Sequence, residues 1–375
     1  MVNHLGNWKN GEFGDFVTLK RGFDLPQQKR EDGQVPIFSS SGITGTHSTA
    51  MVKAPGVITG RYGTIGEVFY AAKDFWPLNT TLFVEDFHGN DAKFIYYFLK
   101  TLEWSKFTSA SAVPGINRNT VHKETVSLPD IETQRRIAST LSMLDEKIKT
   151  NTEINDNLEQ QAQSYFQELF VDNADPEWTT GTISDLGAVV GGSTPSKAKP
   201  EYYTESGIAW ITPKDLSINK SKFASHGEND ITELGLKNSS AVIMPEGTVL
   251  FSSRAPIGYI AIATGEVTTN QGFKSVVPKP EIGTPFVYFF LKNTLPVIEG
   301  MASGSTFKEV SGSTMKKVPA VIPDAETLAK FSSFCAPIFA QQRILEEQNQ
   351  SLAILRDNLL PKLMSGEIDV SDVQL

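Results

Sequence analysis

Two long helical patterns constrain the fold of this chain more than any other feature of its sequence. The first, residues 130–172, opens on Asp130, which can cap a helix, and its apolar residues recur at steps of three and four. The second, residues 324–366, opens on Asp324 and continues in the same way. Roughly 40 residues at about 1.5 Å per residue predict a helix on the order of 60 Å long. Each helix follows a globular stretch, so the chain divides into two halves.

The two halves repeat one plan. Residues of the same type stand 170 positions apart at the start of each half: Trp8, Gly11, Asp15 and Gly22 match Trp178, Gly181, Asp185 and Gly192. The aromatic stretch at 94–100 matches the one at 286–292, at an offset of 192. The second half therefore holds about 24 additional residues, nearly all before its aromatic stretch. The chain therefore contains two copies of one fold, which match at their ends and differ in their middle segments.

Each globular half is predicted to be α/β (α+β). In the first half, short apolar runs bounded by glycine and proline predict strands at 16–19, 57–59, 67–70 and 81–84, and residues 93–102 predict an amphipathic helix. The predicted boundaries are a first domain at 1–129, a long helix at 130–172, a second domain at 173–323, a long helix at 324–366 and a tail at 367–375.

The composition suits a protein that packs normally and stays out of the membrane. The hydrophobic fraction is 39%, no apolar run approaches the length of a membrane span, and Cys335 is the single cysteine. We therefore expect a cytoplasmic protein. The net charge of −9 argues against a nucleic-acid partner, but residues 131–172 and 324–375 each carry 4 basic against 8 acidic residues, which leaves the globular parts near neutral. A near-neutral domain can still gather its basic side chains on one face.

Catalytic and metal-binding motifs do not emerge from the sequence. The glycine-rich segments at 60–66 and 191–197 lack the spacing of a phosphate-binding loop, and the five histidines show no metal-ligand spacing. Asp130 and Asp324 are better explained as helix caps than as nuclease carboxylates. We expect no catalytic residue, no metal site and no cofactor on this chain, which is not an enzyme by itself.

Two tight turns are candidates for contact with DNA. Arg61 lies between two predicted strands, beside Tyr62 and Thr64 and among glycines that permit close backbone approach. Arg254 occupies the equivalent place in the second half. Arginine can grip guanine or a phosphate in a bidentate manner, but it can equally pair with a structural carboxylate.

Two small-residue loops give a similar signal. The loop at 109–118 ends on Asn117 and Arg118, and its counterpart at 302–308 ends on Thr306, Phe307 and Lys308. Small residues followed by a cation suit contacts to phosphate, although an ordinary surface loop explains them equally well. Four further basic residues are weaker candidates: Lys20, Arg21, Lys197 and Lys214.

The whole arrangement resembles the specificity (S) subunit of type I restriction–modification systems. The marks of the resemblance are a Trp-x-x-Gly opening and a Pro-Asp-x-Glu-Thr helix start, each used twice, and the Leu-Leu-x-x-Leu-Met-Ser-Gly-Glu ending at 359–367. The resemblance covers essentially the whole chain. One departure is Pro337, which falls inside the second long helix and predicts a kink or a later start.

The resemblance implies a division of labour. Two target recognition domains would each read one half of a bipartite double-stranded DNA sequence, and the long helices would form an antiparallel coiled coil, in a pseudo-two-fold internal repeat, that spaces them. Two modification (methyltransferase) subunits would bind the helices, and separate restriction subunits would cleave. S-adenosylmethionine, ATP and Mg would belong to those partners, and no membrane would be involved.

Two alternatives remain open at this point. The chain could serve a related system in which modification and cleavage share one polypeptide, and neighbouring genes would separate that reading from the first. It could also be a repeat protein that scaffolds protein partners without a DNA role. A salt-sensitive DNA-binding assay would test that last reading.

Overall fold

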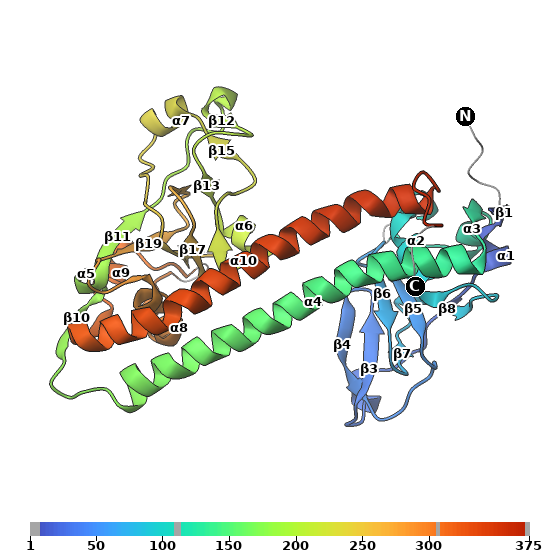
Figure 1. Ribbon diagram of the computed structural model, residues 1–375, viewed down its shortest axis with the longest axis horizontal. Coiled ribbons are helices and arrows are strands. Elements are labelled where there is room, and N and C mark those ends of the chain that lie inside the picture. The colour runs from blue at the N-terminus through green and yellow to red at the C-terminus, as the bar shows by residue number, and fades with distance from the viewer. Residues whose placement is uncertain (1–7, 109–113, 305–307, 372–375) are drawn as a thin grey trace. The chain divides into compact units, whose positions relative to one another are not determined.

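The computed structural model describes residues 8–108, 114–304 and 308–371. The chain divides into two compact units. Unit 1 consists of residues 1–149 and 350–375, and unit 2 consists of residues 150–349. Both are mixed α/β (Figure 1). The fold class predicted from the sequence is confirmed.

Unit 1 is built on a four-stranded antiparallel sheet. Its strand order is β2 (Thr18–Arg21), β8 (Thr81–Asp86), β5 (Gly56–Gly60) and β6 (Val68–Ala71). A second sheet has the order β4 (Gly42–His47), β3 (Val35–Ser39) and β7 (Trp76–Pro77), with β7 parallel to β3. A third sheet pairs β1 (Lys9–Glu12) with β9 (Thr125–Leu128). The unit also contains α1 (Phe13–Phe16), α2 (Ala92–Thr101), α3 (Arg118–His122) and two 3-10 turns, Gln27–Lys29 and Trp104–Phe107.

Unit 2 is built on a five-stranded sheet. Its order is β11 (Gly187–Gly191), β19 (Lys274–Pro278), β16 (Val249–Ser253), β17 (Ile257–Ala263) and β14 (Phe223–Ala224). Three strand pairs accompany it: β10 (Thr179–Thr182) with β20 (Pro319–Ile322), β12 (Tyr203–Thr204) with β15 (Asp230–Ile231), and β13 (Trp210–Ile211) with β18 (Thr268–Thr269). Its shorter helices are α5 (Ile183–Leu186), a 3-10 turn at Pro200–Tyr202, α6 (Pro213–Ile218), α7 (Glu233–Lys237), α8 (Thr284–Gly300) and α9 (Gly312–Lys316).

The internal repeat is visible in the strand order. The order β2-β8-β5-β6 of unit 1 recurs in unit 2 as β11-β19-β16-β17, and β1/β9 recurs as β10/β20. The parallel pair β3/β7 recurs as β13/β18. The additional residues of unit 2 lie between β13 and β16, where α6, β14, β15 and α7 stand.

One local prediction in unit 1 needs correction, and two strands were missed. The strand predicted at 16–19 begins instead at Thr18 and ends at Arg21, because Phe13–Phe16 forms one helical turn. That turn is held by a capping box in which the Asp15 carboxylate accepts from the Glu12 backbone N–H at 3.0 Å, and Phe13 is fully buried. The strands β3 (Val-Pro-Ile-Phe-Ser) and β4 (Gly-Ile-Thr-Gly-Thr-His) were not predicted, since neither alternates apolar with polar residues.

The two long helices are α4 (Ile131–Gln167), which continues as a π-helix at Glu168–Asp172, and α10 (Ala325–Met364). Asp130 and Asp324 cap them, and each carboxylate accepts the backbone N–H three residues later at 2.9 Å. The helix-capping interpretation of both aspartates is therefore confirmed. Pro337 lies inside α10, and the helix is continuous through it.

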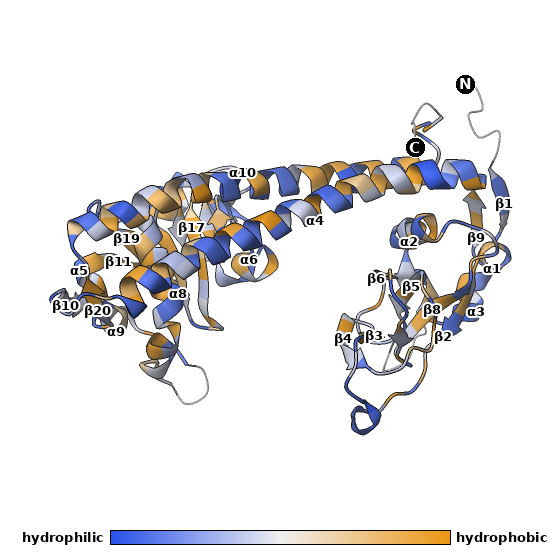
Figure 2. Ribbon diagram, turned by 60° about the horizontal axis from the view of Figure 1, so that its bottom comes forward, coloured by the Kyte–Doolittle hydropathy of each residue, from blue (hydrophilic) through white to orange (hydrophobic). Residues whose placement is uncertain are grey.

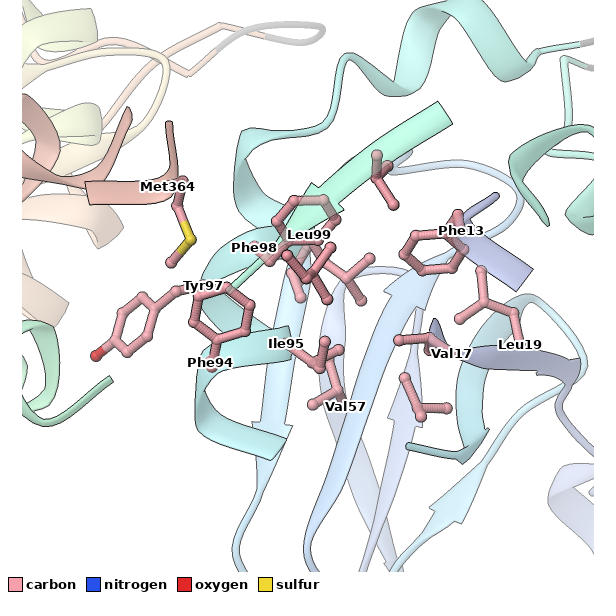
Figure 3. Close-up of a cluster of buried hydrophobic side chains, with 14 of the residues drawn as sticks. Phe13, Val17, Leu19, Val57, Phe94, Ile95, Tyr97, Phe98, Leu99 and Met364 are labelled. Atoms are coloured by element: carbon pink, nitrogen blue, oxygen red, sulfur yellow. The ribbon is translucent and has the colours of Figure 1, made fainter. Parts of the chain in front are cut away.

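Both helices are part of the core of the units through which they pass. In unit 1, Phe94 and Phe98 of α2 are buried in one cluster with Met364 of α10 (Figure 3). Ile137 and Leu141 of α4 and Leu363 of α10 belong to the same cluster. A corresponding cluster in unit 2 contains residues of α4, α8 and α10: Ala162, Phe166, Phe286, Phe289, Phe331 and Ile338. Apolar residues recur along both helices (Figure 2). The burial of several of them in these two clusters explains the periodicity in the sequence.

The pairing of α4 with α10 is antiparallel within each unit. In unit 1 the Arg356 guanidinium lies 2.7 Å from the Asp145 carboxylate. In unit 2 the Asn151 amide donates to Asn349 at 2.9 Å, and the Gln342 amide donates to the Asn155 carbonyl at 3.1 Å. Rising residue numbers on one helix therefore meet falling numbers on the other.

Among the helices of the described residues, none combines the length and the apolar character that a membrane span requires.

Candidate nucleic-acid interface

Unit 1 carries a polar groove of about 750 Å³ where two strands of its main sheet end. We call it groove 1. The end of β2, the turn after β5, the segment 115–117 and the start of α3 all contribute to its wall. Six of the residues predicted to contact DNA line it: Lys20, Arg21, Arg61, Tyr62, Asn117 and Arg118. Segments far apart in the sequence are thus brought together on one face.

The backbone of Arg61 is held on both sides. Its N–H donates to the Thr80 carbonyl at 2.8 Å, and its carbonyl accepts from the Ile116 N–H at 3.0 Å. Its guanidinium carbon lies 4.5 Å from the centroid of the Tyr62 ring, at cation–π distance. That ring in turn packs on Gly115, where a Cβ would come within 2.1 Å of Tyr62 Cε1. The glycine is therefore required for the position of Tyr62 and, through it, of Arg61.

The turn that holds Arg61 is also built around glycine. A Cβ on Gly60 would lie 1.9 Å from the Thr64 carbonyl oxygen, so the chain closes on itself directly after β5. Gly63 has a φ of +77°, in the left-handed region that favours glycine. Thr64 is exposed in this turn but does not line groove 1.

Arg118 is fixed at the other wall of groove 1 by α3 and β2. Asn117 caps α3 by accepting the Asn119 N–H at 3.0 Å, and the Arg118 guanidinium donates to the Leu19 carbonyl at 3.5 Å. His122, also on α3, accepts the Leu19 N–H at 2.9 Å. Burial lowers the pKa of His122, and the charge of Arg118 lowers it further, which favours the neutral ring that accepts this bond.

The cations of groove 1 differ in how they are neutralised. Lys20 lies 2.5 Å from Glu85, and Arg21 lies 3.9 Å from Asp24. Among the described residues, Arg61 and Arg118 have no carboxylate within ion-pair distance. The described residues that line groove 1 include four cationic side chains and one carboxylate, Asp24. An anionic ligand such as a phosphate backbone would find uncompensated positive charge here.

In unit 2 the equivalent arginine has a carboxylate partner. Arg254 follows β16 as Arg61 follows β5, and its guanidinium lies 3.6 Å from the Glu309 carboxylate. Lys274 shares the same carboxylate at 3.8 Å. Burial lowers the pKa of Lys274, and Glu309 partly restores it. The structural pairing left open by the sequence is thus seen at Arg254, and its contact with DNA stays a prediction.

Lys197 and Lys214 lie together at another place in unit 2. They line a pocket of about 370 Å³ with Thr194, Trp210 and Gln271. Arg254 does not line this pocket. Lys214 pairs with Glu228 at 2.7 Å, and this contact raises the pKa of the lysine. We call this pocket the Lys197 pocket.

Two predicted contacts remain to be placed. Lys308 is exposed and directly precedes Glu309, whereas Thr306 lies outside the described residues. No residue prediction in either unit is tested by the geometry alone. What the structure adds is that the unit 1 candidates share one groove, while the unit 2 candidates occupy separate places.

Sequence reasoning missed a buried ion network in unit 2. The Lys222 side chain, 6% exposed, lies 2.8 Å from Glu159 of α4 and donates to Gln342 of α10 at 2.9 Å. Lys292 of α8 reaches the same glutamate at 2.5 Å. Burial lowers the pKa of Lys222 to about 8, although Glu159 opposes that shift. The network attaches the globular part of unit 2 to both long helices, and no local sequence pattern announces it.

A repeated frame whose two copies carry different side chains on equivalent turns is typical of a modular binding protein. The model of the type I restriction modification DNA specificity domain matches residues 6–160 and 176–355. The chain therefore belongs to this family, and the resemblance inferred from the sequence is confirmed.

Individual relatives support the same assignment. The chain is 41% identical over 170 residues to the type I restriction enzyme MjaIX specificity subunit of Methanocaldococcus jannaschii, a match that spans 45% of this chain and 39% of the relative. It is 25% identical over 347 residues to the HindI specificity subunit of Haemophilus influenzae, covering 72% of this chain and 75% of the relative. The S subunit structure from M. genitalium covers 97% of both chains with a TM-score of 0.64 at 19% identity, which shows a shared fold.

Proposed function

We propose that this chain is the DNA-reading subunit of a type I restriction–modification complex, with each unit contacting one half of a bipartite double-stranded target. The observation that carries the proposal is groove 1. Arg61, whose guanidinium lies over the Tyr62 ring, and Arg118 have no carboxylate partner among the described residues, and glycines shape the wall on which they lie. Base edges and phosphates are the ligands that such arginines bind.

The repeated frame supports a bipartite target. Equivalent strands place equivalent turns in both units, while the side chains on those turns differ. One unit would therefore read a different short sequence from the other. The family membership supports the same reading, because its matched regions fall on both units.

The long helices are proposed to bind the partner proteins. Residues 131–172 and 324–375, which contain the two long helices, each carry 8 acidic against 4 basic residues. Two modification subunits would bind one copy of this chain, and restriction subunits would join that assembly. S-adenosylmethionine, ATP and Mg would be held by those partners, so this chain would contribute recognition and no catalytic group. A cytoplasmic location, where such complexes meet DNA, belongs to the same proposal.

DNA binding by the co-expressed complex tests this function. The complex should bind one bipartite duplex more tightly than scrambled duplexes, and its affinity should fall as salt rises, because bound phosphates release counterions. Sequencing of methylated DNA from the same cells should return a two-part motif. A complex that assembles but binds all duplexes equally, at every salt concentration, would contradict the proposal.

A further inference from the structure

Both units hold an amide side chain at the same point of the repeated frame. Gly22 and Gly192 are equivalent, and each touches the loop that follows the short parallel strand, β7 or β18. A Cβ on Gly22 would lie 2.2 Å from the Leu78 carbonyl oxygen, and one on Gly192 would lie 2.1 Å from that of Asn270. The residue after this contact is Asn79 in unit 1 and Gln271 in unit 2.

Each amide is held by a side chain two residues after its glycine. In unit 1 the Asn79 amide N–H donates to the Asp24 carboxylate. In unit 2 the Thr194 hydroxyl donates to the Gln271 amide oxygen. The two bonds run between equivalent positions but use different chemical groups. The shared backbone contacts thus fix the position of the amide, while its side-chain partner, Asp24 or Thr194, fixes the orientation of the amide group.

These side-chain bonds are not what holds the loops in place. The backbone N–H of Phe23 donates to the Pro77 carbonyl at 2.8 Å, and the equivalent N–H of Ser193 donates to the Thr269 carbonyl at 2.8 Å. Together with the glycine contacts, these bonds already fix the loop against the neighbouring turn. The amides therefore remain available for another partner.

The unused hydrogen-bonding groups match one base. After its bond to Asp24, Asn79 keeps an amide oxygen and one N–H, and after its bond from Thr194, Gln271 keeps an acceptor site and its amide N–H groups. Adenine presents a donor at N6 and an acceptor at N7 in the major groove, and an Asn or Gln amide satisfies both at once.

Cations stand beside each amide pair. Asp24, the partner of Asn79, lines groove 1 with Arg21 and Arg61. Gln271 lines the Lys197 pocket with Lys197 and Lys214. Neighbouring cations can hold the phosphates while an amide reads the base edge, which is the usual division between positioning and specificity.

We propose that Asn79 and Gln271 are equivalent base-reading residues, and that each contacts the adenine of an A·T pair in a different half-site. The inference rests on the proposed DNA-binding function and adds the base and the residue to it. It also moves the centre of recognition in unit 2 from the Arg254 turn to the Lys197 pocket.

The test uses the assembled complex with Asn79→Asp or Gln271→Glu. Each change keeps the shape of the side chain but replaces the donating nitrogen by oxygen, so the adenine pattern is lost. Binding is measured on a pool of duplexes in which every pair of both half-sites is varied. Asn79→Asp should lower the preference for one A·T pair about 5- to 150-fold, in one half-site only, and Gln271→Glu should do so in the other.

Two matched variants protect the test. The exchange Asp24→Asn with Asn79→Asp keeps one amide and one carboxylate at the pair and avoids facing charges, so it should fold and still lose the preference. Asn10→Asp, an exposed amide on β1, should leave every preference unchanged. If the variants bind with the parent's sequence preference, or weaken on all sequences alike, the base-reading role is overturned. A parent complex without any sequence preference would overturn the proposed function itself.

Discussion

Arg61 in unit 1 and Arg254 in unit 2 follow equivalent strands, but their electrostatic surroundings differ. Arg61 lies against the Tyr62 ring and, among the described residues, has no carboxylate partner. Arg254 shares Glu309 with Lys274. The frame therefore fixes the position of the arginine, while residues elsewhere in each unit decide whether its charge is available. Two arginines at equivalent positions of the repeat can therefore differ in how much of their charge is available to a ligand.

The attachment of each unit to the long helices shows a second difference. In unit 1 the Tyr97 hydroxyl donates to Asp145 of α4 at 2.6 Å. The equivalent residues of unit 2, Phe289 and Phe339, make a ring contact with centroids 6.1 Å apart. Unit 2 has a polar attachment through Lys222, which directly precedes β14, the strand that its five-stranded sheet has in addition to those matched in unit 1. The more elaborate unit is thus anchored by a buried charge.

The largest effect is expected from breaking that buried charge. Lys222→Met removes one of the two cations that pair with Glu159 and the donor to Gln342, so the free energy of unfolding of unit 2 should fall by about 3 kcal/mol. Tyr97→Phe removes one hydrogen bond in unit 1 and should cost about 1 kcal/mol. Amide hydrogen exchange of β16 and β5 reports the two units separately. Lys220→Met, an exposed neighbour, is the control. If Lys222→Met and Tyr97→Phe lowered the free energy of unfolding of their units equally, the two attachments would not differ in strength.

The next effect concerns the two arginines. Arg61→Ala should weaken DNA binding by about 1–3 kcal/mol, because an available bidentate group is lost. Arg254→Ala should change binding by less than about 0.5 kcal/mol, because its charge is already shared with Glu309. Titration of each variant complex with its target duplex gives both values. A larger effect at Arg254 would show that Glu309 releases the arginine when DNA binds.

Glu309→Gln sharpens the same comparison in the opposite direction. The change keeps the shape of the side chain and leaves Arg254 and Lys274 without their shared carboxylate. If either cation then reaches a phosphate, binding should tighten several-fold and the salt slope should steepen by about one. Lys274→Met in the same background should reverse part of the gain. An unchanged salt slope would mean that this turn does not approach DNA.

The smallest effect is a pH dependence carried by Lys222. Its pKa is lowered by burial from 10.5 to about 8, so between these values the unfolded chain binds more protons and stability rises with pH. From pH 7.5 to 8.5 the gain should be about 0.7 kcal/mol. Burial raises the pKa of Cys335 to about 12, which works against stability mainly above pH 9. Urea unfolding of the parent and of Lys222→Met should differ by this slope.

Much of the fold could be predicted because its signals are local. The helices at 130–172 and 324–366 are announced by capping aspartates and apolar periodicity, and the repeat by matched glycine and tryptophan positions. Strands such as β3 and β4 escaped because their side chains do not alternate in polarity.

The site was only partly predictable for a related reason. Glycines and small residues near Arg61 and Arg118 in the sequence made these two arginines candidates. The carboxylate beside Arg254 belongs to Glu309, which is 55 positions away, and no local sequence pattern predicts a contact over that separation. Lys222 was missed for the same reason, since its partners lie on α4 and α10. Asn79 and Gln271 carried a usable signal: the offsets of 170 and 192, applied together, pair them and their partners Asp24 and Thr194.

The most direct measurement of the central claim, that each unit reads its own half-site through its own face, is the methylation motif of the Arg61→Ala complex. Sequencing of methylated DNA from cells that express the variant with its modification subunit gives the motif of both half-sites at once. The account predicts that one half-site relaxes at one or two positions while the other keeps its bases. A motif that relaxes in both half-sites together, or in neither while binding is weakened, would contradict it.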